Sequence, residues 1–215
     1  MPVIKNWEAI SHRSGGESVL PESITDERLL AEASRGDEAA FLALYERHRD
    51  VVFRFAYRML GSMELAEDVT HDCFLSLFKS PSRFDTSRGV TLRTYLLAAA
   101  RNLAMKHFRS RRGEDALDSL TGELSVPAHH GPLHKLLDEE LAVAVRRAIE
   151  ELPPLQREAL VLFEYEELPL AEIAAITGAD VGTVKSRLHR ARQSLKKKLA
   201  PYLKSEEVIV DEVLK

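Results

Sequence analysis

Apolar residues recur at three- and four-residue steps along most of this chain, a spacing that places them on one side of an α-helix. No stretch shows the sustained alternation of Val, Ile or Thr that marks a half-buried strand. The pattern therefore predicts an all-α protein. Because Ser, Thr and Asp accept backbone hydrogen bonds at helix starts, we expect Thr25 or Asp26 to cap the first helix and Asp37 the second. In the first half of the chain the predicted helices cover Glu27–Ser34, 38–60, 62–80 and Leu92–Arg112.

The second half of the chain predicts further helices separated by clear breakers. Pro153 and Pro154 end one helix and suit the first turn of the next. Gly178 suits the left-handed position after a helix end, and Asp180 can cap the helix that follows. Pro201 is expected to stop the last helix. These helices cover Lys135–Leu152, Leu155–Glu164, Leu170–Thr177 and Val181–Leu199.

Glycine, proline and acidic residues collect between residues 113 and 134 and interrupt the helical pattern. This composition predicts a flexible linker, and therefore two small helical domains at residues 24–112 and 135–200. Residues 1–23 show no clear period, so we interpret them as a mobile extension. Acidic and apolar residues alternate in the tail at residues 201–215, and we expect this tail to be disordered rather than folded back onto a basic surface.

The last predicted helix has one apolar and one basic side. Val184, Leu188, Ala191 and Leu195 share the apolar side, and no acidic residue occurs in the helix. Basic helix faces are often only solvated surface. Here a short helix and a three-residue turn with glycine come first, which is the helix-turn-helix signature. The combination predicts a helix that reads DNA in the major groove, with Lys185, Ser186, His189 and Arg190 on the reading side.

Two other predicted helices each have a face that carries charge of mainly one sign. The helix over Leu92–Arg112 is basic, and Tyr95 and Phe108 lie among its cations, which permits stacking on bases as well as phosphate contacts. The helix over residues 62–80 instead has an acidic side, formed by Glu64, Glu67, Asp68, His71 and Asp72. Such a side is either solvated surface or the docking face for a basic partner. A metal site is the weaker reading, because no motif such as HExxH accompanies these residues.

The composition adds limits to this picture. The chain has 215 residues and a formal net charge of -4, so the basicity of the last helix is local. It has one cysteine, which excludes an intrachain disulfide and fits a reducing compartment. We expect a cytoplasmic protein without cofactor, because the chain has no apolar run of about 18 residues, no signal pattern and no phosphate-binding or metal motif. His129, His130 and His134 lack paired cysteines, so we assign them to linker composition.

Taken together, the sequence resembles the extracytoplasmic-function (ECF) sigma factors, the minimal two-domain specificity subunits of bacterial RNA polymerase. Five blocks match that family in the right order across about residues 25–200. They are GDEAAFLALYERH, AEDVTHDCFL, YLLAAARNLAMKHFRSRR, LPPLQREALVLFEYEELPLAEIAAITG and VGTVKSRLHRAR. The last of these is highly specific to the family.

The resemblance implies a set of partners and site residues. The protein would bind core RNA polymerase, at the clamp of its largest subunit and at its flap region, and an anti-sigma factor or other regulator would control it. The clamp-binding residues would be Glu64, Glu67, Asp68 and Asp72. The residues that melt and capture the −10 promoter element would be Phe84, Arg88, Arg93, Arg101, Asn102, Lys106 and Arg109. The residues that bind the −35 duplex would be Thr183, Lys185, Ser186, Arg187, His189, Arg190 and Arg192, with Arg187 and Arg192 on phosphates.

Two other function classes remain as alternatives. A stand-alone helix-turn-helix regulator would bind operator DNA tightly as a dimer and would need no polymerase. An enzyme, such as a metal-dependent nuclease, would need a catalytic constellation, and the sequence offers no nucleophile elbow, glycine-rich phosphate loop or metal motif. We therefore expect a promoter-specificity subunit with no catalytic residues and no metal.

Overall fold

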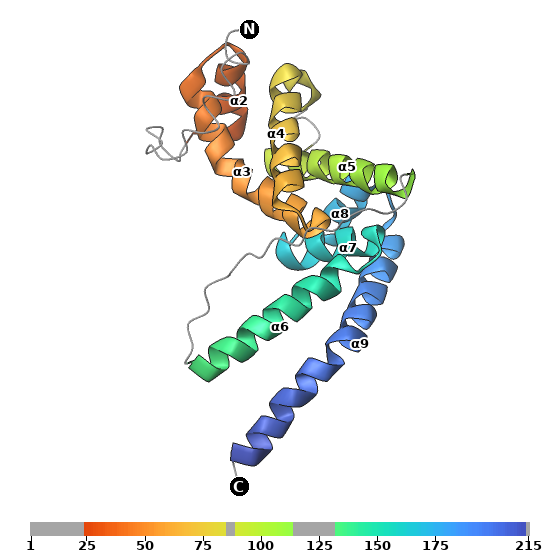
Figure 1. The fold of residues 1–215 in the computed structure, drawn as a ribbon. Coiled ribbons are helices and arrows are strands. Elements are labelled where there is room, and N and C mark those ends of the chain that lie inside the picture. Colours follow the sequence, from red (N-terminus) through yellow and green to blue (C-terminus); the bar gives the residue numbers. More distant parts are fainter. Residues whose placement is uncertain (1–23, 85–88, 114–131, 214–215) are drawn as a thin grey trace. The chain divides into compact units, whose positions relative to one another are not determined.

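The computed structural model describes residues 24–84, 89–113 and 132–213, and every regular element in these ranges is helical. The all-α prediction is therefore confirmed. The helices form two compact units, one of α2, most of α3, α4 and α5, and the other of α6 to α9 (Figure 1). The predicted extension at residues 1–23 lies outside the described residues, as does most of the predicted linker at residues 113–134. The two ends of that linker, residue 113 and residues 132–134, belong to the neighbouring helices instead.

The first unit contains the four helices that the apolar pattern predicts. Thr25 is the cap of the first helix, because its hydroxyl accepts a hydrogen bond from the Arg28 amide at 3.4 Å. Asp37 caps the second, since its carboxylate accepts from the amides of Ala39 and Ala40 at 2.9 and 3.1 Å. The elements are α2 (Asp26–Ser34), α3 (Glu38–Leu60), α4 (Met63–Lys79), the short 3-10 helix η2 (Pro81–Arg83) and α5 (Leu92–Gly113).

Aromatic rings of α3 and α4 form the core of the first unit. The ring centroids of Phe41 and Phe78 lie 4.2 Å apart, and those of Tyr45 and Phe74 lie 4.9 Å apart in an edge-on arrangement. The spacing of Ala66, Val69, Cys73 and Leu77 predicts one apolar side of α4, and all four residues are buried. Burial also raises the pKa of the Cys73 thiol to about 12, so this cysteine is a packing residue without thiolate chemistry.

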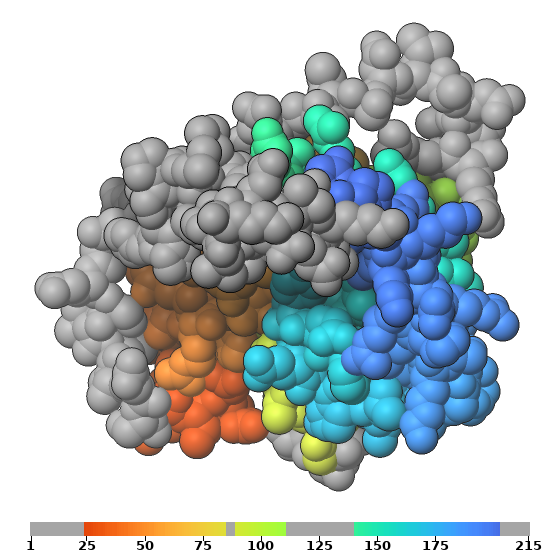
Figure 2. All heavy atoms as spheres, turned by 90° about the horizontal axis from the view of Figure 1, so that it is seen from below, coloured from red at the N-terminus to blue at the C-terminus, as the bar shows by residue number. Residues whose placement is uncertain are grey.

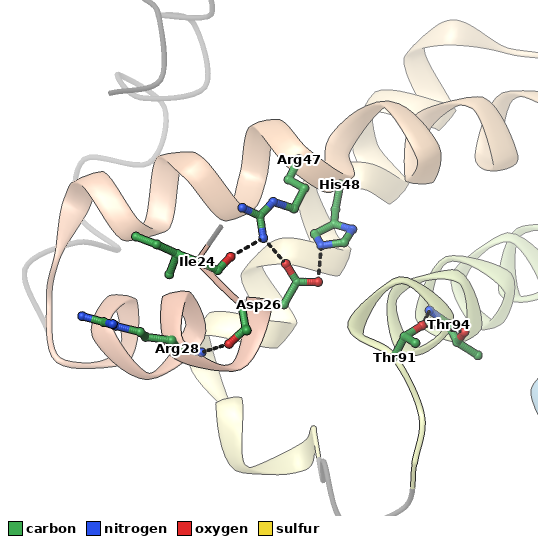
Figure 3. Close-up of polar contacts among 8 residues, drawn as sticks. Ile24, Asp26, Arg28, Arg47, His48, Thr91 and Thr94 are labelled. Carbon is green, nitrogen blue, oxygen red and sulfur yellow. Dashed lines mark hydrogen bonds and ion pairs between the residues drawn. The ribbon is translucent and has the colours of Figure 1, made fainter. Parts of the chain in front are cut away.

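Asp26 joins α2 to α3 through both of its carboxylate oxygens (Figure 3). One oxygen accepts a hydrogen bond from Arg47 at 2.7 Å, and the other lies 2.8 Å from Nε2 of His48. Arg47 also donates to the Ile24 carbonyl at 2.9 Å. The sequence places His48 in the apolar stripe of α3; the structure buries it there, but as the polar partner of Asp26.

This contact makes the first unit sensitive to acid. Burial alone would raise the pKa of Asp26, but the hydrogen bonds and positive charges of His48 and Arg47 outweigh it and lower this pKa. The stabilisation is therefore present above the pKa of the unfolded chain, near about 4, and is lost as pH falls through the lower folded pKa. We expect Asp26→Asn to cost about 1 kcal/mol at pH 7 and less at pH 3. Urea unfolding at both pH values measures this, and an equal cost at both would contradict it.

The buried side of α5 differs in part from the predicted one. The apolar spacing places Leu96, Ala99, Ala100 and Leu103 inward, and of these Leu96 and Ala100 are fully buried. Leu92, Leu96, Ala100 and Ala104 are buried at steps of four, whereas Ala99 and Leu103 are half-buried. The residues buried along α5 are Leu92, Thr94, Leu96, Leu97, Ala100, Ala104 and Met105.

The second unit is a bundle in which α9 contacts α6, α7 and α8. Ile149, Leu152, Leu160 and Ala191 form a buried cluster in it, and Val145 and Leu195 pack against this cluster. The predicted helix over Leu155–Glu164 is divided, because its second half is a π-helix in which an extra residue enters the turn. The elements are α6 (Pro132–Glu150), α7 (Pro154–Leu160), the π-helix η4 (Val161–Tyr165), α8 (Leu170–Thr177) and α9 (Val181–Val213).

The prediction that Pro201 stops the last helix is wrong, because α9 runs through it to Val213. A proline removes one backbone donor and costs about 3 kcal/mol inside a helix. The residues on either side, such as Lys198 before it and Leu203 and Lys204 after it, are good helix formers and favour continuation of the helix. The expectation of a disordered tail is wrong for the same residues, up to Val213.

Candidate nucleic-acid interface

The turn between α8 and α9 has the geometry that the sequence predicts. Gly178 ends α8 in the left-handed conformation, with φ 63° and ψ 31°, and its amide donates to the Ala174 carbonyl. The Asp180 carboxylate then accepts from the Thr183 amide at 2.8 Å and from the Thr183 hydroxyl at 2.6 Å. These bonds fix where α9 begins and so fix which of its side chains point outward.

The two sides of α9 are confirmed. Val184, Leu188 and Ala191 are 0%, 4% and 0% exposed. The side chains of α8 and α9 form one continuous surface beside each other (Figure 2). Lys185, Ser186, His189 and Arg190 are all exposed, on the side opposite the buried residues.

The exposed residues of α9 differ in whether they already form hydrogen bonds within the protein. The Ser186 hydroxyl donates to the Thr183 carbonyl at 2.8 Å, and Thr183 is held by Asp180. Lys185 and Arg190 have no intramolecular polar partner among the residues that the structure describes. These two cations can therefore bind another molecule without first breaking a bond within the protein.

Arg187 lies differently from the other predicted DNA-binding residues. Its Nη1 lies 3.0 Å from Oε1 of Glu158 on α7, and the two side chains are 19% and 0% exposed. Glu158 is fully buried, and a buried carboxylate is strongly destabilising without a positive partner. The pair therefore joins α9 to α7.

Arg192 also has a carboxylate partner, but at the surface. Its Nε and Nη2 both donate to Oε1 of Glu164, at 3.0 and 2.6 Å. The side chains of the pair are 55% and 42% exposed. The Arg192 guanidinium also lies 5.3 Å from the centre of the Phe163 ring, which holds it by a cation–π contact. Neither carboxylate is predicted from the sequence, where only Glu158 leaves a signal, as a charged residue within the largely apolar segment LPPLQREALVLF.

In the first unit the predicted −10 residues that the structure describes fall into three groups by exposure. Asn102, Lys106 and Arg109 are exposed on α5, whereas Arg93 and Arg101 are half-buried, and Arg101 donates to the Asn102 side chain at 3.2 Å. Phe84 is only 7% exposed and packs edge-on against Tyr95, with ring centroids 5.6 Å apart. Arg88 lies outside the described residues.

The start of α5 is fixed by a local hydrogen-bond pattern. The Thr91 hydroxyl accepts from the Thr94 amide at 3.2 Å and lies 2.9 Å from the Thr94 hydroxyl (Figure 3). Thr91 is thus the cap of this helix, although the sequence places it at the end of a loop. The cap and the Phe84–Tyr95 contact define where α5 begins to present its polar side chains.

The acidic side of α4 is an open surface. Glu64, Glu67, Asp68 and Asp72 are exposed, and none of them forms an ion pair with another described residue. No three His, Cys, Asp or Glu side chains gather as a metal site would require within the described ranges. His129 and His130 and the side chain of His134 lie outside those ranges. No helix within them is long and apolar enough to cross a membrane.

Comparison with protein families identifies both units. The sigma-70 region 2 family matches residues 44–114, and the sigma-70 region 4 family matches residues 142–195. The chain is also 31% identical over 178 residues to the ECF RNA polymerase sigma factor SigW of Bacillus subtilis, which covers 79% of this chain and 94% of SigW. The protein is an ECF sigma factor. It directs promoter-specific initiation of transcription by RNA polymerase, and the alternative of a stand-alone regulator is not favoured.

Other relatives of this sigma factor agree with that assignment. The ECF sigma-E factor of Escherichia coli K12 is 31% identical over 194 residues, covering 86% of this chain and 100% of that protein. Among solved structures, the sigma factor RpoE of Bartonella quintana in complex with the anti-sigma factor NepR has a TM-score of 0.60 at 25% identity, covering 74% and 96% of the two chains. CnrH in complex with the cytosolic domain of CnrY has a TM-score of 0.58 at 26% identity, covering 82% and 97%.

Proposed function

We propose that α9 binds the −35 promoter element in the major groove through its exposed side. The observation that carries this proposal is the exposed, unpaired state of Lys185 and Arg190 opposite a fully buried stripe. Lysine and arginine can donate to the acceptor edge of guanine, so these two residues contact bases. Ser186 and His189 lie between them on the same side, and Thr183 at the helix start contacts the backbone.

The two remaining arginines of α9 have different roles in this proposal. Arg192 is at the surface, so it contacts a phosphate, which fixes register without reading sequence. Arg187 would have to leave a fully buried carboxylate to reach DNA, so it acts as a positioning residue that sets the pose of α9 on α7.

Base contacts and phosphate contacts give different results on substitution. We expect Lys185→Ala or Arg190→Ala to cost about 1–3 kcal/mol at particular −35 base pairs and less where those pairs are already changed. Lys197→Ala, also exposed on α9, is the matched control and should weaken binding equally on all sequences. Run-off transcription by the holoenzyme from a set of −35 variants measures this. Equal losses on every sequence would assign Lys185 and Arg190 to phosphates.

For the −10 element, we propose that α5 provides the binding surface. Asn102, Lys106 and Arg109 are exposed on it, and Arg101 holds the Asn102 side chain. Arg93 and Arg88 complete the cationic set. Phe84 supports this surface from beneath, by packing on Tyr95, rather than stacking on a base. Extruding a base costs a few kcal/mol, and hydrogen bonds from the donors of α5 would offset part of that cost.

For the polymerase, the acidic surface of α4 would dock on a basic face of the clamp of the largest subunit, and the second unit would contact the flap region. Opposite charges speed and orient such docking. Catalysis of RNA synthesis would belong to the polymerase, and this chain would contribute no catalytic residue, cofactor or metal. It would act in the cytoplasm, where polymerase and promoters are. Its structural relative RpoE of Bartonella quintana is in complex with an anti-sigma factor, and CnrH is in complex with the cytosolic domain of CnrY, which supports an anti-sigma factor or similar regulator here.

Reconstituted transcription tests the proposed function directly. Core polymerase is mixed with the full chain and with genomic DNA of the source, and transcript starts are mapped. We expect new starts that share one −35 and one −10 element and that require both components. Operator binding without core polymerase, or the absence of any new start, would contradict the proposal.

A further inference from the structure

The surface pair of Arg192 with Glu164 is the feature that the proposed function does not explain. We propose that Glu164 competes with DNA phosphate for Arg192, and thereby limits the non-specific DNA affinity of the second unit. This inference rests on the proposed function, since it concerns the same helix α9. It assigns to Glu164 a regulatory role in DNA binding.

The geometry of the pair makes Glu164 a substitute for phosphate. Nε and Nη2 of Arg192 form one edge of the guanidinium, and both donate to the same carboxylate oxygen, at 3.0 and 2.6 Å. A phosphate oxygen binds that same edge of an arginine. While Glu164 occupies the edge, a DNA phosphate has no donors left on it.

The position of Arg192 along α9 places this competition at the DNA-binding side. Lys185, His189 and Arg192 follow one another at steps of four and three residues, so they share one face of the helix. The Glu164 carboxylate therefore stands at the end of the exposed basic face.

Local structure keeps Glu164 in reach of Arg192. Glu164 belongs to the π-helix η4, where one extra residue per turn shifts the direction of the side chains relative to α7. The Phe163 ring of the same segment lies 5.3 Å from the Arg192 guanidinium and holds it in place. Both contacts therefore come from one short segment.

Exposure makes the pair displaceable, unlike the pair formed by Arg187. With 55% and 42% of the side chains exposed, Arg192 and Glu164 lie in contact with water, where an ion pair is weak. Glu158, which is 0% exposed, cannot move into water without leaving the core. The same helix thus carries one fixed and one exchangeable arginine.

Phosphate contacts carry no sequence information, so weakening them lowers non-specific binding more than specific binding. A sigma factor whose Arg192 is paired with Glu164 would therefore spend less time on non-promoter DNA. Once base contacts hold α9 in the groove, the phosphate is close enough to displace Glu164.

Binding to a non-specific duplex tests the inference without knowledge of the promoter. The full chain is titrated with a fluorescein-labelled 30-base-pair DNA of mixed sequence between about 20 and 200 mM NaCl. We expect Glu164→Gln to tighten binding by about two- to five-fold. We also expect the plot of log affinity against log salt to steepen by about 1, because one more phosphate is neutralised.

Two variants control this experiment. Glu140→Gln removes the same charge from an exposed site on α6, and its salt slope should equal that of the parent. In an Arg192→Gln background, Glu164→Gln should change neither affinity nor slope. The inference is overturned if Glu164→Gln behaves like Glu140→Gln, or if its gain persists without Arg192.

The proposed function fails separately from this inference. Lys197→Ala, which the proposed function expects to weaken binding equally on all sequences, should also weaken binding to this duplex. If it does not, α9 is not the DNA-binding helix, whatever Glu164→Gln shows. If it does and Glu164→Gln has no effect, only the competition is wrong.

Discussion

Arg187→Ala is expected to destabilise the second unit by about 3 kcal/mol, although the residue lies on the most basic helix of the chain. The substitution leaves the Glu158 carboxylate, which is 0% exposed, without the guanidinium that lies 3.0 Å away. The loss of a charged partner by a buried carboxylate is far more costly than the loss of a surface contact. Urea unfolding followed by far-UV circular dichroism measures the effect as an earlier transition of the second unit.

Two further variants separate this effect from a general loss of helix stability. Arg190→Ala removes an exposed arginine three residues away and should change the free energy of unfolding by less than about 0.5 kcal/mol. The double variant Arg187→Met, Glu158→Leu replaces both charges by apolar groups and should recover much of the lost stability. A stable Arg187→Ala protein with reduced DNA affinity would instead make Arg187 a phosphate contact.

Asp68→Arg is expected to weaken binding of core polymerase by about ten- to one hundred-fold. The acidic surface of α4 would then present a positive charge to a basic partner, and such like-charge contacts cost several kcal/mol. The fold should be unchanged, because Asp68 is exposed and forms no ion pair with a described residue. Fluorescence titration of labelled protein with core polymerase gives the affinity.

Glu27→Arg is the matched charge reversal on the exposed side of α2, outside the acidic surface. Its polymerase affinity should stay within about two-fold of the parent. Raising the salt concentration from 50 to 300 mM should reduce the difference in polymerase affinity between the Asp68→Arg protein and the parent, because exposed charges are screened. An Asp68→Arg protein that binds polymerase as tightly as the parent would exclude this surface from the interface.

The amino-acid sequence determined most of the local structure. The spacing of Val184, Leu188 and Ala191 identified the buried side of α9, and Gly178 and Asp180 identified the turn before it. These features are local, because a helix period and a cap depend on residues within a few positions of each other. The order of the family blocks then determined the class of protein.

The sequence was less reliable where several opposing free-energy terms decide where a helix ends or which of its sides is buried. It placed a helix end at Pro201, but one lost hydrogen bond did not outweigh the helix formers around it. It also chose the wrong inward residues for half of α5, because a stretch rich in alanine and leucine offers several apolar sides. Contact with α4 selects among them.

Only the tertiary structure decided what each arginine of α9 does. In the sequence, Arg187, Arg190 and Arg192 are equivalent cations on one helix. Their carboxylate partners come from residues 28 and 29 positions earlier, on α7 and η4. The packing of these helices decides the partner of each arginine. It places Arg187 against the buried Glu158, pairs Arg192 with Glu164 at the surface and leaves Arg190 unpaired among the described residues. No local sequence pattern encodes that packing.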